Sequence, residues 1–391
     1  MADSYDVAII GGGIMGCCTA YELARRGLKV ILLEKDSIGG ASTGRSSAIV
    51  RQHYSNELTA RMALYSVRVF QHFRDLIGDD CGFHRTGFVA LATASDREGL
   101  EANVALQRAV GIETSVLSIA DLRELVPTID PAGIVAAAYE PESGYADPHL
   151  TVSAYAAAAR RHGAQLVPDT EVTGITFAGD RVTGVAARTG RYPAARVINC
   201  AGPWGARVAA MAGIEAPIHS CRAQVAVFRR PDEYAADHPV VLDFPNAAYY
   251  RAETGNLTIA GLIDPAEAKA VVDPDDYDET IDADFIELVG ARFLSRFPMM
   301  ASTESRGGFA GLYAITPDWH PIIDEVPEGS GHYLCTGFSG HGFKLGPAVG
   351  RMVADMVTEA ASCEFDPRPF RLSRYAENDP VRGRYEYGIA G

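Results

Sequence analysis

Three glycines and a glutamate near the N-terminus have the spacing of a dinucleotide-binding turn. Gly11, Gly13 and Gly16 form the pattern G-x-G-x-x-G, and Glu34 ends the next apolar run. In such a turn the first glycine permits a tight bend, the second lets a pyrophosphate reach backbone N–H groups, and the third lets a helix pack on a strand. Glu34 would accept hydrogen bonds from an adenosine ribose, which favours a cofactor without a 2′-phosphate. This unit alone does not separate NAD from FAD.

A second small-residue segment follows at residues 39–47 (GGASTGRSS). It carries several hydroxyl groups and one arginine, Arg45. Such a loop can wrap a diphosphate and a flavin edge, because hydroxyls and an arginine fork both donate hydrogen bonds to phosphate. The continuation at 48–54 (AIVRQHY) is too apolar for a free linker.

Two further glycine turns follow apolar strands later in the chain. They lie at residues 197–205 (VINCAGPWG) and 333–347 (YLCTGFSGHGFKLGP). An apolar strand that ends in Ala-Gly is another place where backbone can approach a cofactor closely. Glycine turns of the cofactor-binding type therefore occur near residues 11, 202 and 340.

The elements that position these turns can be predicted from periodicity. The segment 5–10 is β-branched and typical of a buried parallel strand, and it is followed by a helix at 17–27 and a strand at 29–33. The remaining pattern predicts helices at 56–77, 96–110, 148–162, 281–297 and 348–358, strands at 87–93 and 134–139, a meander at 165–187 and a β-rich stretch at 217–262.

Composition excludes several classes of protein. The chain has 391 residues, which suggests two or three structural units. Its 35 basic against 50 acidic residues give a net charge of −15, and no basic block could follow a nucleic-acid backbone. Seven cysteines without a C-x-x-C pair indicate reduced thiols, and no metal site is expected. With no signal-like N-terminus and no membrane-length apolar run, we expect a cytoplasmic protein.

The motifs together resemble a known family. The N-terminal unit, the strand VINCAG, the stretch GLYAITPDWHPIID at 311–324 and the loop GFSGHGFKLGP are similar to the D-amino-acid oxidase superfamily of FAD enzymes. The sarcosine-oxidase-like branch is the most similar, including the β subunit of the heterotetrameric enzyme. The resemblance implies an α/β (α+β) fold, in which a Rossmann-like FAD-binding domain is interleaved with a substrate domain whose mixed β-sheet roofs the flavin.

The resemblance also implies domain limits and cofactor contacts. The FAD-binding domain is expected at 1–80, 145–215 and 320–391, and the substrate domain at 81–144 and 216–319. The residues expected to bind FAD are Gly11, Gly13, Ile14, Met15, Gly16, Glu34, Lys35, Ser42, Thr43, Arg45, Ser46, Ser47, Val172, Ala201, Gly202, Trp204, Gly311, Gly337, Phe338, Gly340, His341, Gly342, Phe343 and Lys344.

The resemblance implies oxidation of the C–N bond of a secondary or N-substituted amino acid. Hydride would pass from Cα to flavin N5, and the resulting imine would hydrolyse. Arg51 and Lys344 are placed to grip the substrate carboxylate, as a fork and a point charge. For Arg51 the alternative is a structural ion pair, and for Lys344 a contact with flavin alone. Tyr250 and Tyr313 fall where relatives have pocket aromatics, although a core position is the alternative for each.

The chain departs from relatives at the positions that tether flavin. A cysteine stands in monomeric sarcosine oxidases where this chain has Gly311, and a histidine stands in dimethylglycine-dehydrogenase-like enzymes where it has Arg45. We therefore expect non-covalent FAD. Thr258 aligns with a lysine that promotes reaction with oxygen in the monomeric enzymes, so the hypothesis is a dehydrogenase. His149 falls near an FMN attachment position, but helix-capping surroundings are the better interpretation.

Three readings of the function remain open. The first is the amino acid oxidase or dehydrogenase, with oxygen or another acceptor taking the electrons. The second keeps the fold and changes the substrate to a 2-hydroxy acid, which would call for a positioned base. The third is the flavin-bearing subunit of a multi-subunit amino acid or opine dehydrogenase, with partner subunits.

Overall fold

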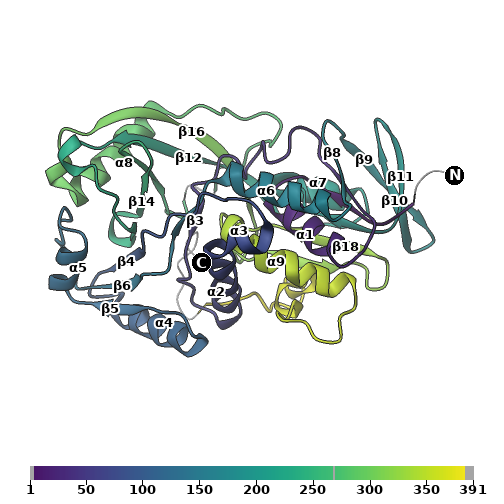
Figure 1. The fold of residues 1–391 in the computed structure, drawn as a ribbon, viewed down its shortest axis with the longest axis horizontal. Helices are drawn as coiled ribbons and strands as arrows, with labels where there is room; N and C mark the ends of the chain where they lie inside the picture. The colour runs from purple at the N-terminus through teal and green to yellow at the C-terminus, as the bar shows by residue number, and fades with distance from the viewer. Residues whose placement is uncertain (1–3, 267–268, 384–391) are drawn as a thin grey trace.

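Two large β-sheets stand side by side in the structure, a computed structural model that describes residues 4–266 and 269–383. The first sheet and its helices occupy the right of Figure 1, and the second sheet occupies the left. The α/β class expected from the sequence is confirmed. No helix in the described ranges has both the length and the apolar character needed to cross a membrane.

The first sheet is built from three separate stretches of chain. Its main path runs β17-β18-β11-β1-β2-β8, and β9 and β10 extend it from β11. The pairs from β8 through β18 are parallel, and β17 closes the edge as an antiparallel strand. The strands are β1 (Tyr5–Ile10), β2 (Val30–Leu33), β8 (Gln165–Val167), β9 (Val172–Ala178), β10 (Arg181–Ala187), β11 (Gly190–Asn199), β17 (Ile322–Glu325) and β18 (His332–Thr336).

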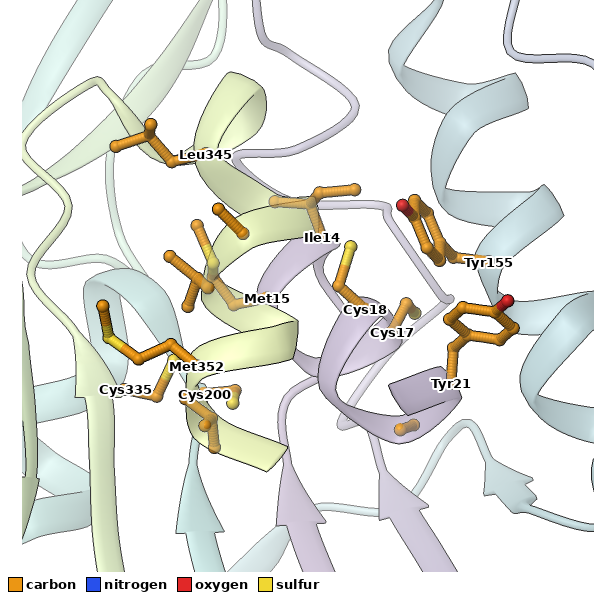
Figure 2. Packing of buried hydrophobic residues seen from close by; sticks show 14 of the residues in the cluster. Ile14, Met15, Cys17, Cys18, Tyr21, Tyr155, Cys200, Cys335, Leu345 and Met352 are labelled. Carbon is orange, nitrogen blue, oxygen red and sulfur yellow. The ribbon is translucent and has the colours of Figure 1, made fainter. Parts of the chain in front are cut away.

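Two helices that are far apart in sequence pack closely against one face of this sheet. α1 (Ile14–Ala24) and α9 (Gly342–Val357) cross in Figure 2, with α6 (Pro148–Arg161) beside α1. A Cβ at Gly350 of α9 would lie 2.8 Å from Cys18 of α1, so glycine is what allows this approach. Burial raises the pKa of Cys18, which keeps this thiol protonated inside the core.

The second sheet has two differently covered faces. Its order is β16-β12-β15-β14-β13-β4-β6-β5. α8 (Ala283–Arg296) and α5 (Ile119–Leu125) pack on one face, and α4 (Arg97–Val110) packs on part of the other. The strands are β4 (Phe88–Ala92), β5 (Ser115–Leu117), β6 (Ala136–Glu140), β12 (His219–Arg229), β13 (Val240–Asp243), β14 (Ala248–Glu253), β15 (Leu257–Leu262) and β16 (Glu304–Ile315).

Short elements connect the two sheets. β3 (Ile49–Val50) pairs with β7 (Gly144–Tyr145), and α7 (Gly205–Ala210) follows β11.

Two helices differ from their predicted bounds. The helix expected at 56–77 is two helices, α2 (Glu57–Gln71) and α3 (Phe73–Ile77), because the helix is interrupted at His72. α9 begins at Gly342 rather than at residue 348, which places Lys344 in its first turn.

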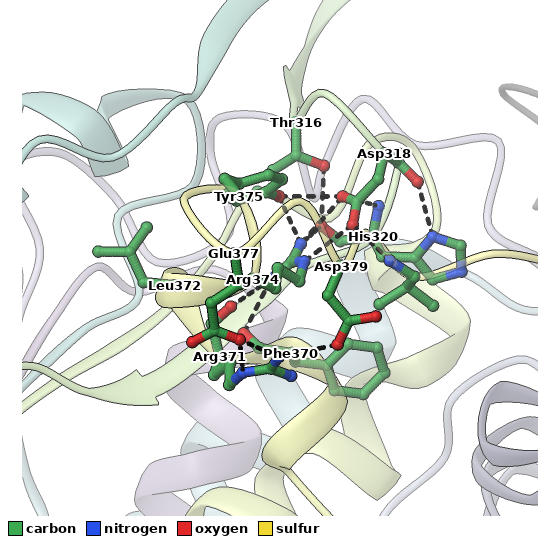
Figure 3. A network of polar contacts seen from close by, with 12 residues as sticks. Thr316, Asp318, His320, Phe370, Arg371, Leu372, Arg374, Tyr375, Glu377 and Asp379 are labelled. Carbon is green, nitrogen blue, oxygen red and sulfur yellow. Dashed lines mark hydrogen bonds and ion pairs between the residues drawn. The ribbon is translucent and has the colours of Figure 1, made fainter.

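A buried arginine fastens the C-terminal segment to the loop after β16. Arg374 makes a two-pronged ion pair with Asp318, at 2.8 and 2.9 Å, and donates to the carbonyl of His320 (Figure 3). The same loop is joined to the glycine turn after β18, since Thr316 N donates to Ser339 Oγ at 3.1 Å. This network fixes the end of the strand that carries Tyr313.

Candidate functional site

A cavity of about 280 Å³ begins where β1 meets α1 and continues beneath the second sheet. α1 starts without a side-chain cap at Gly13 and has no acidic residue in its first turn. Its N–H groups and its positive dipole end are therefore suited to an anion. Ile14 N is satisfied by Thr43 Oγ1 at 3.0 Å, so the hydroxyl loop is held directly against this turn.

The residues around the cavity fit a dinucleotide. Ser42 Oγ is buried beside the turn and has no hydrogen-bond partner in the described ranges, so a bound phosphate would satisfy it. Glu34 accepts from Gly12 N at 2.6 Å and from Asp36 N at 2.9 Å, which fixes its carboxylate at the end of β2. Its remaining lone pairs can accept from ribose hydroxyls.

Most of the predicted cofactor residues line this cavity. Those that do are Gly11, Gly13, Ile14, Met15, Glu34, Lys35, Ser42, Thr43, Arg45, Ser46, Ser47, Val172, Ala201, Gly202, Trp204, Gly311, Phe338, Gly340, Gly342 and Phe343. Four predicted residues lie outside the lining. Gly16 is behind the turn, Gly337 packs against Thr316, and His341 and Lys344 lie against Tyr54.

An acidic segment that the sequence did not reveal reaches the part of the cavity lined by Lys35 and Trp204. Asp275 lies between β15 and α8 and accepts from Lys35 at 2.6 Å, Trp204 Nε1 at 2.7 Å and Arg207 at 2.6 Å. Lys35 Nζ also lies 3.8 Å from the Trp204 ring centroid. The hydrogen bond from Lys35 helps to hold the pKa of Asp275 below its ordinary value. Arg45 is tied to the same segment through Glu279, at 2.5 Å.

Neutralising this carboxylate should loosen cofactor retention. Asp275→Asn is expected to raise the rate of FAD loss about three- to tenfold at low salt, because three donors lose their common anion. In wild type the rate should rise towards the variant's value in 1 M KCl, where screening is strong. Recovery of free FAD fluorescence after dilution measures it. Asp366→Asn, at an exposed pair with Arg368, is the matched control. Equal rates at every salt concentration would contradict the prediction.

Arg51 and Lys344 meet at one buried aromatic ring. The guanidinium carbon of Arg51 lies 4.5 Å from the centroid of Tyr54, and Lys344 Nζ lies 6.0 Å from the same centroid. Burial and the charge of Arg51 lower the pKa of Lys344 well below its ordinary value. Tyr54 is fully buried, its hydroxyl has no hydrogen-bond partner in the described chain, and burial raises its pKa to about 12. Tyr54 was not predicted as a site residue, because only the fold brings its ring close to both cations.

The two predicted pocket tyrosines, Tyr313 and Tyr250, lie on opposite faces of the second sheet, which the sequence did not reveal. Tyr313 lines the cavity, with its ring against Gly340. Tyr250 does not fit the pocket role: it is fully buried on the opposite face of the sheet, packed on Phe293 and Phe297 of the α8 region. Its neighbour Tyr249 faces the cavity side, because successive side chains on a strand alternate. Electrostatic contact with Tyr313 and a hydrogen bond involving Ser47 place Tyr249 at the site.

Removal of the hydroxyl group should have different effects on catalysis at Tyr249 and at Tyr250. Tyr250→Phe is expected to leave kcat/KM unchanged and to keep or raise stability by up to about 1 kcal/mol, because the lost hydroxyl is buried without a partner. Tyr249→Phe removes the contact with Ser47 and should lower kcat/KM about three- to tenfold. Steady-state kinetics and thermal unfolding of both variants provide the measurement. A larger kinetic loss in Tyr250→Phe would reverse the assignment of faces.

Thr258 does not occupy the position expected for it. Its side chain is on the α8 face of β15, where its hydroxyl contacts Arg230 at 3.0 Å and His238 at 3.2 Å. The positions of β15 that share a face with the cavity-lining Val225 are Leu257, Ile259 and Gly261. Thr258 therefore gives no support to the hypothesis of a slow reaction with oxygen.

Two positions that correspond to flavin-attachment sites in similar proteins, His149 and Gly311, contact the hydroxyl loop at residues 39–47. His149 follows Asp147, the N-cap of α6, and its ring lies so close to Gly44 that a Cβ there would be 2.5 Å from Cε1. At Gly311, a Cβ would be 3.0 Å from the Cβ of Arg45. Both contacts are packing contacts that shape the loop around the cavity.

The architecture and the cavity define a nucleotide-dependent flavoenzyme fold: a Rossmann-like sheet with a glycine turn, roofed by a second mixed sheet. The family described as "DAO: FAD dependent oxidoreductase" matches residues 6–356. The chain belongs to this family of FAD-dependent oxidoreductases.

Several characterised proteins are similar to the chain over most of its length. Human mitochondrial sarcosine dehydrogenase is 30% identical over 90% of this chain, which spans 39% of that protein's length. Glycine oxidase of Geobacillus kaustophilus is 27% identical over 96% of the chain and 98% of its own length. The crystal structure of L-proline dehydrogenase from P. horikoshii matches with a TM-score of 0.89 and 29% identity, covering 97% of this chain and all of the other.

Proposed function

We propose that this chain oxidises the C–N bond of a secondary or N-substituted amino acid whose carboxylate is bound by Arg51 and Lys344. The observation that carries the proposal is the convergence of these two cations on Tyr54. Both side chains are buried, and like charges in a desolvated site are costly. A bound carboxylate offsets that cost, and an arginine fork beside a lysine suits its geometry.

The start of α9 adds to the preference for an anion. Lys344 lies in the first turn of this helix, which contains no acidic residue. The helix N-terminus carries partial positive charge, so it destabilises the lysine cation further. A carboxylate placed here favours the charged lysine, so we expect binding to be accompanied by proton uptake at Nζ.

The names of similar proteins support the substrate class. Sarcosine, glycine and L-proline are all small amino acids with one carbon between amine and carboxylate, and two of them are secondary amines. Those substrates belong to the proteins named for them. For this chain they support a small amino acid held by its carboxylate.

The residues of this chain contribute positioning rather than acid–base chemistry. Bound FAD supplies the two-electron oxidant. Arg51 and Lys344 fix the carboxylate, and therefore the orientation of the neighbouring Cα. Tyr249 and Tyr313 present aromatic rings from the roofing sheet, which exclude water and can pack on an alkylated amine. Since the reactive amine is the unprotonated form, no general base is required from the chain.

Anaerobic bleaching of the flavin tests the proposal. The panel contains sarcosine, L-proline, glycine, D-alanine, an opine and 2-hydroxy acids. We expect bleaching by secondary amino acids and none by their amides, which lack the carboxylate. Bleaching by hydroxy acids alone would favour the hydroxy acid alternative, and bleaching by no amine would overturn the proposal.

The electron acceptor and any partner subunits are tested with the same preparation. Peroxide released stoichiometrically on turnover would identify oxygen as the acceptor, whereas reduction of an added dye alone would identify a dehydrogenase. Turnover by a homogeneous single-chain preparation would exclude the reading in which the chain needs partner subunits. We further propose that FAD is non-covalent, so acid-precipitated protein should be colourless.

A further inference from the structure

The segment that carries Arg51 lies in no helix or strand. It leaves β3 at Val50 and enters α2 at Glu57, so side chains from elsewhere must hold it. Within the segment, Arg51 donates to the carbonyl of His53. The position of the guanidinium therefore depends on how the backbone of Gln52 and His53 is fixed.

One buried carboxylate reaches both of these residues. Glu140 ends β6 and is fully buried. Its Oε2 accepts from Gln52 N at 2.8 Å and from Ser143 Oγ at 2.7 Å. Its Oε1 lies 3.6 Å from His53 Nδ1 and has no hydrogen-bond partner in the described chain. A single side chain thus contacts the two residues that immediately follow Arg51.

A second side chain, from α4, also holds the segment that carries Arg51. Gln107 is fully buried, and its Nε2 donates to Tyr54 O at 3.3 Å and lies 3.1 Å from His53 Nδ1. The segment is therefore held between the second sheet and α4. Of Glu140 and Gln107, the two side chains that hold this segment, only Glu140 carries a negative charge.

The charge of Glu140 acts on the same ring, Tyr54, as the charge of Arg51. In the described chain no lysine or arginine pairs with it directly, and the ionisable group beside its Oε1 is the His53 ring, at 3.6 Å. The charges of Arg51 and Glu140 both influence the pKa of Tyr54, so the carboxylate lies near the same ring. A buried carboxylate is costly unless hydrogen bonds and nearby positive charge offset the cost. Here the hydrogen bonds from Gln52 N and Ser143 Oγ supply that offset.

We propose that Glu140 is the positioning residue for Arg51: it fixes the backbone at Gln52 and His53 and so sets the affinity of the site for carboxylate substrates. This inference rests on the proposed function, because it assumes that Arg51 binds the substrate carboxylate. Glu140 itself acts through Arg51 and does not touch the substrate.

The test compares Glu140→Gln with wild-type holoenzyme. Glutamine keeps the size of the side chain and removes its charge. We expect KM for the best amino acid of the panel to rise at least tenfold, and kcat to change less than threefold. The Kd of acetate, measured by perturbation of the flavin spectrum, should rise in parallel. Glu142→Gln, two residues further along and paired with Arg85, should leave both values unchanged. A fall in kcat at constant KM and constant acetate affinity would overturn the inference.

A double variant separates this inference from the function on which it rests. If Glu140 acts through Arg51, Arg51→Gln combined with Glu140→Gln should bind acetate no more weakly than Arg51→Gln alone. Additive losses would overturn the positioning role and leave the carboxylate site intact. An Arg51→Gln variant with unchanged acetate affinity would instead overturn the proposed function. If Glu140→Gln does not fold, Ser143→Ala removes one donor to the same carboxylate; a two- to threefold rise in KM and acetate Kd supports the inference, and unchanged values overturn it.

Discussion

Arg51→Gln is expected to lower kcat/KM for a small amino acid by about a hundredfold, the largest kinetic effect of any single change outside the glycine turn. Removing one partner of a buried charge-assisted contact costs about 2–5 kcal/mol, and about 2.7 kcal/mol corresponds to a hundredfold change. The loss should appear mainly in KM, because the interaction orients the substrate before it reacts. Arg51→Lys should fall between, since lysine keeps the charge and loses the fork.

The controls for this prediction separate charge from structure. Arg61→Gln removes an exposed pair with Glu57 on α2 and should leave kinetics unchanged. Steady-state kinetics with an amino acid and the Kd of acetate measure the carboxylate dependence. A loss of kcat/KM with an unchanged Kd of acetate would show that Arg51 stabilises the fold rather than the bound carboxylate.

The pH dependence of KM follows from the lowered pKa of Lys344. Carboxylate binding favours the charged lysine, so affinity should fall as pH rises through that pKa. One cause of the lowering is the charge of Arg51, after burial. In Arg51→Gln this cause is gone, so the fall in affinity should move to higher pH. A pH profile that is identical in the two proteins would contradict this coupling.

Local chemistry made the cofactor turn predictable, whereas the substrate side depended on long-range geometry. Gly11, Gly13 and Glu34 act within one β-α-β unit, so their spacing carries the information. The pocket aromatic on β14 was misplaced by one residue, since an apolar run buried on both faces does not reveal which tyrosine faces which side. Asp275 and Tyr54 gave no local signal, because their partners are distant in sequence.

Helix starts show the same limit. α1 begins at Ile14, inside the glycine turn, because Thr43 from the hydroxyl loop satisfies the N–H of Ile14. α9 begins at Gly342, although its glycines predict a loop. Packing of α9 on α1 stabilises these residues as helix, since glycines here let the two helices approach. Tertiary contacts therefore decided the boundary that brings Lys344 beside Arg51.

Gly16→Ala should abolish FAD binding by preventing the turn itself. A Cβ at Gly16 would lie 1.9 Å from the carbonyl oxygen of Gly11 and 3.3 Å from Leu32, and neither backbone atoms nor the strand can yield that space locally. Little free space surrounds Gly11 itself, because a Cβ there would lie 2.5 Å from the carbonyl oxygen of Cys200, just after β11. The first turn of α1 must then separate from β1, which removes the N–H groups that face the pyrophosphate.

Two matched glycine variants show whether packing or cofactor approach is lost. At Gly13 the nearest atom to an added Cβ is Thr43 Oγ1, at 3.1 Å, so Gly13→Ala should fold and bind FAD at least tenfold more weakly. At Gly174, on β9, nothing lies within 4 Å, so Gly174→Ala should behave as wild type. FAD content on purification, FAD affinity of the apoprotein and thermal unfolding distinguish the three. Because the clash at Gly16 involves backbone, Gly16→Ala should lose both stability and FAD, and a stable yellow Gly16→Ala protein would show that the turn can rearrange.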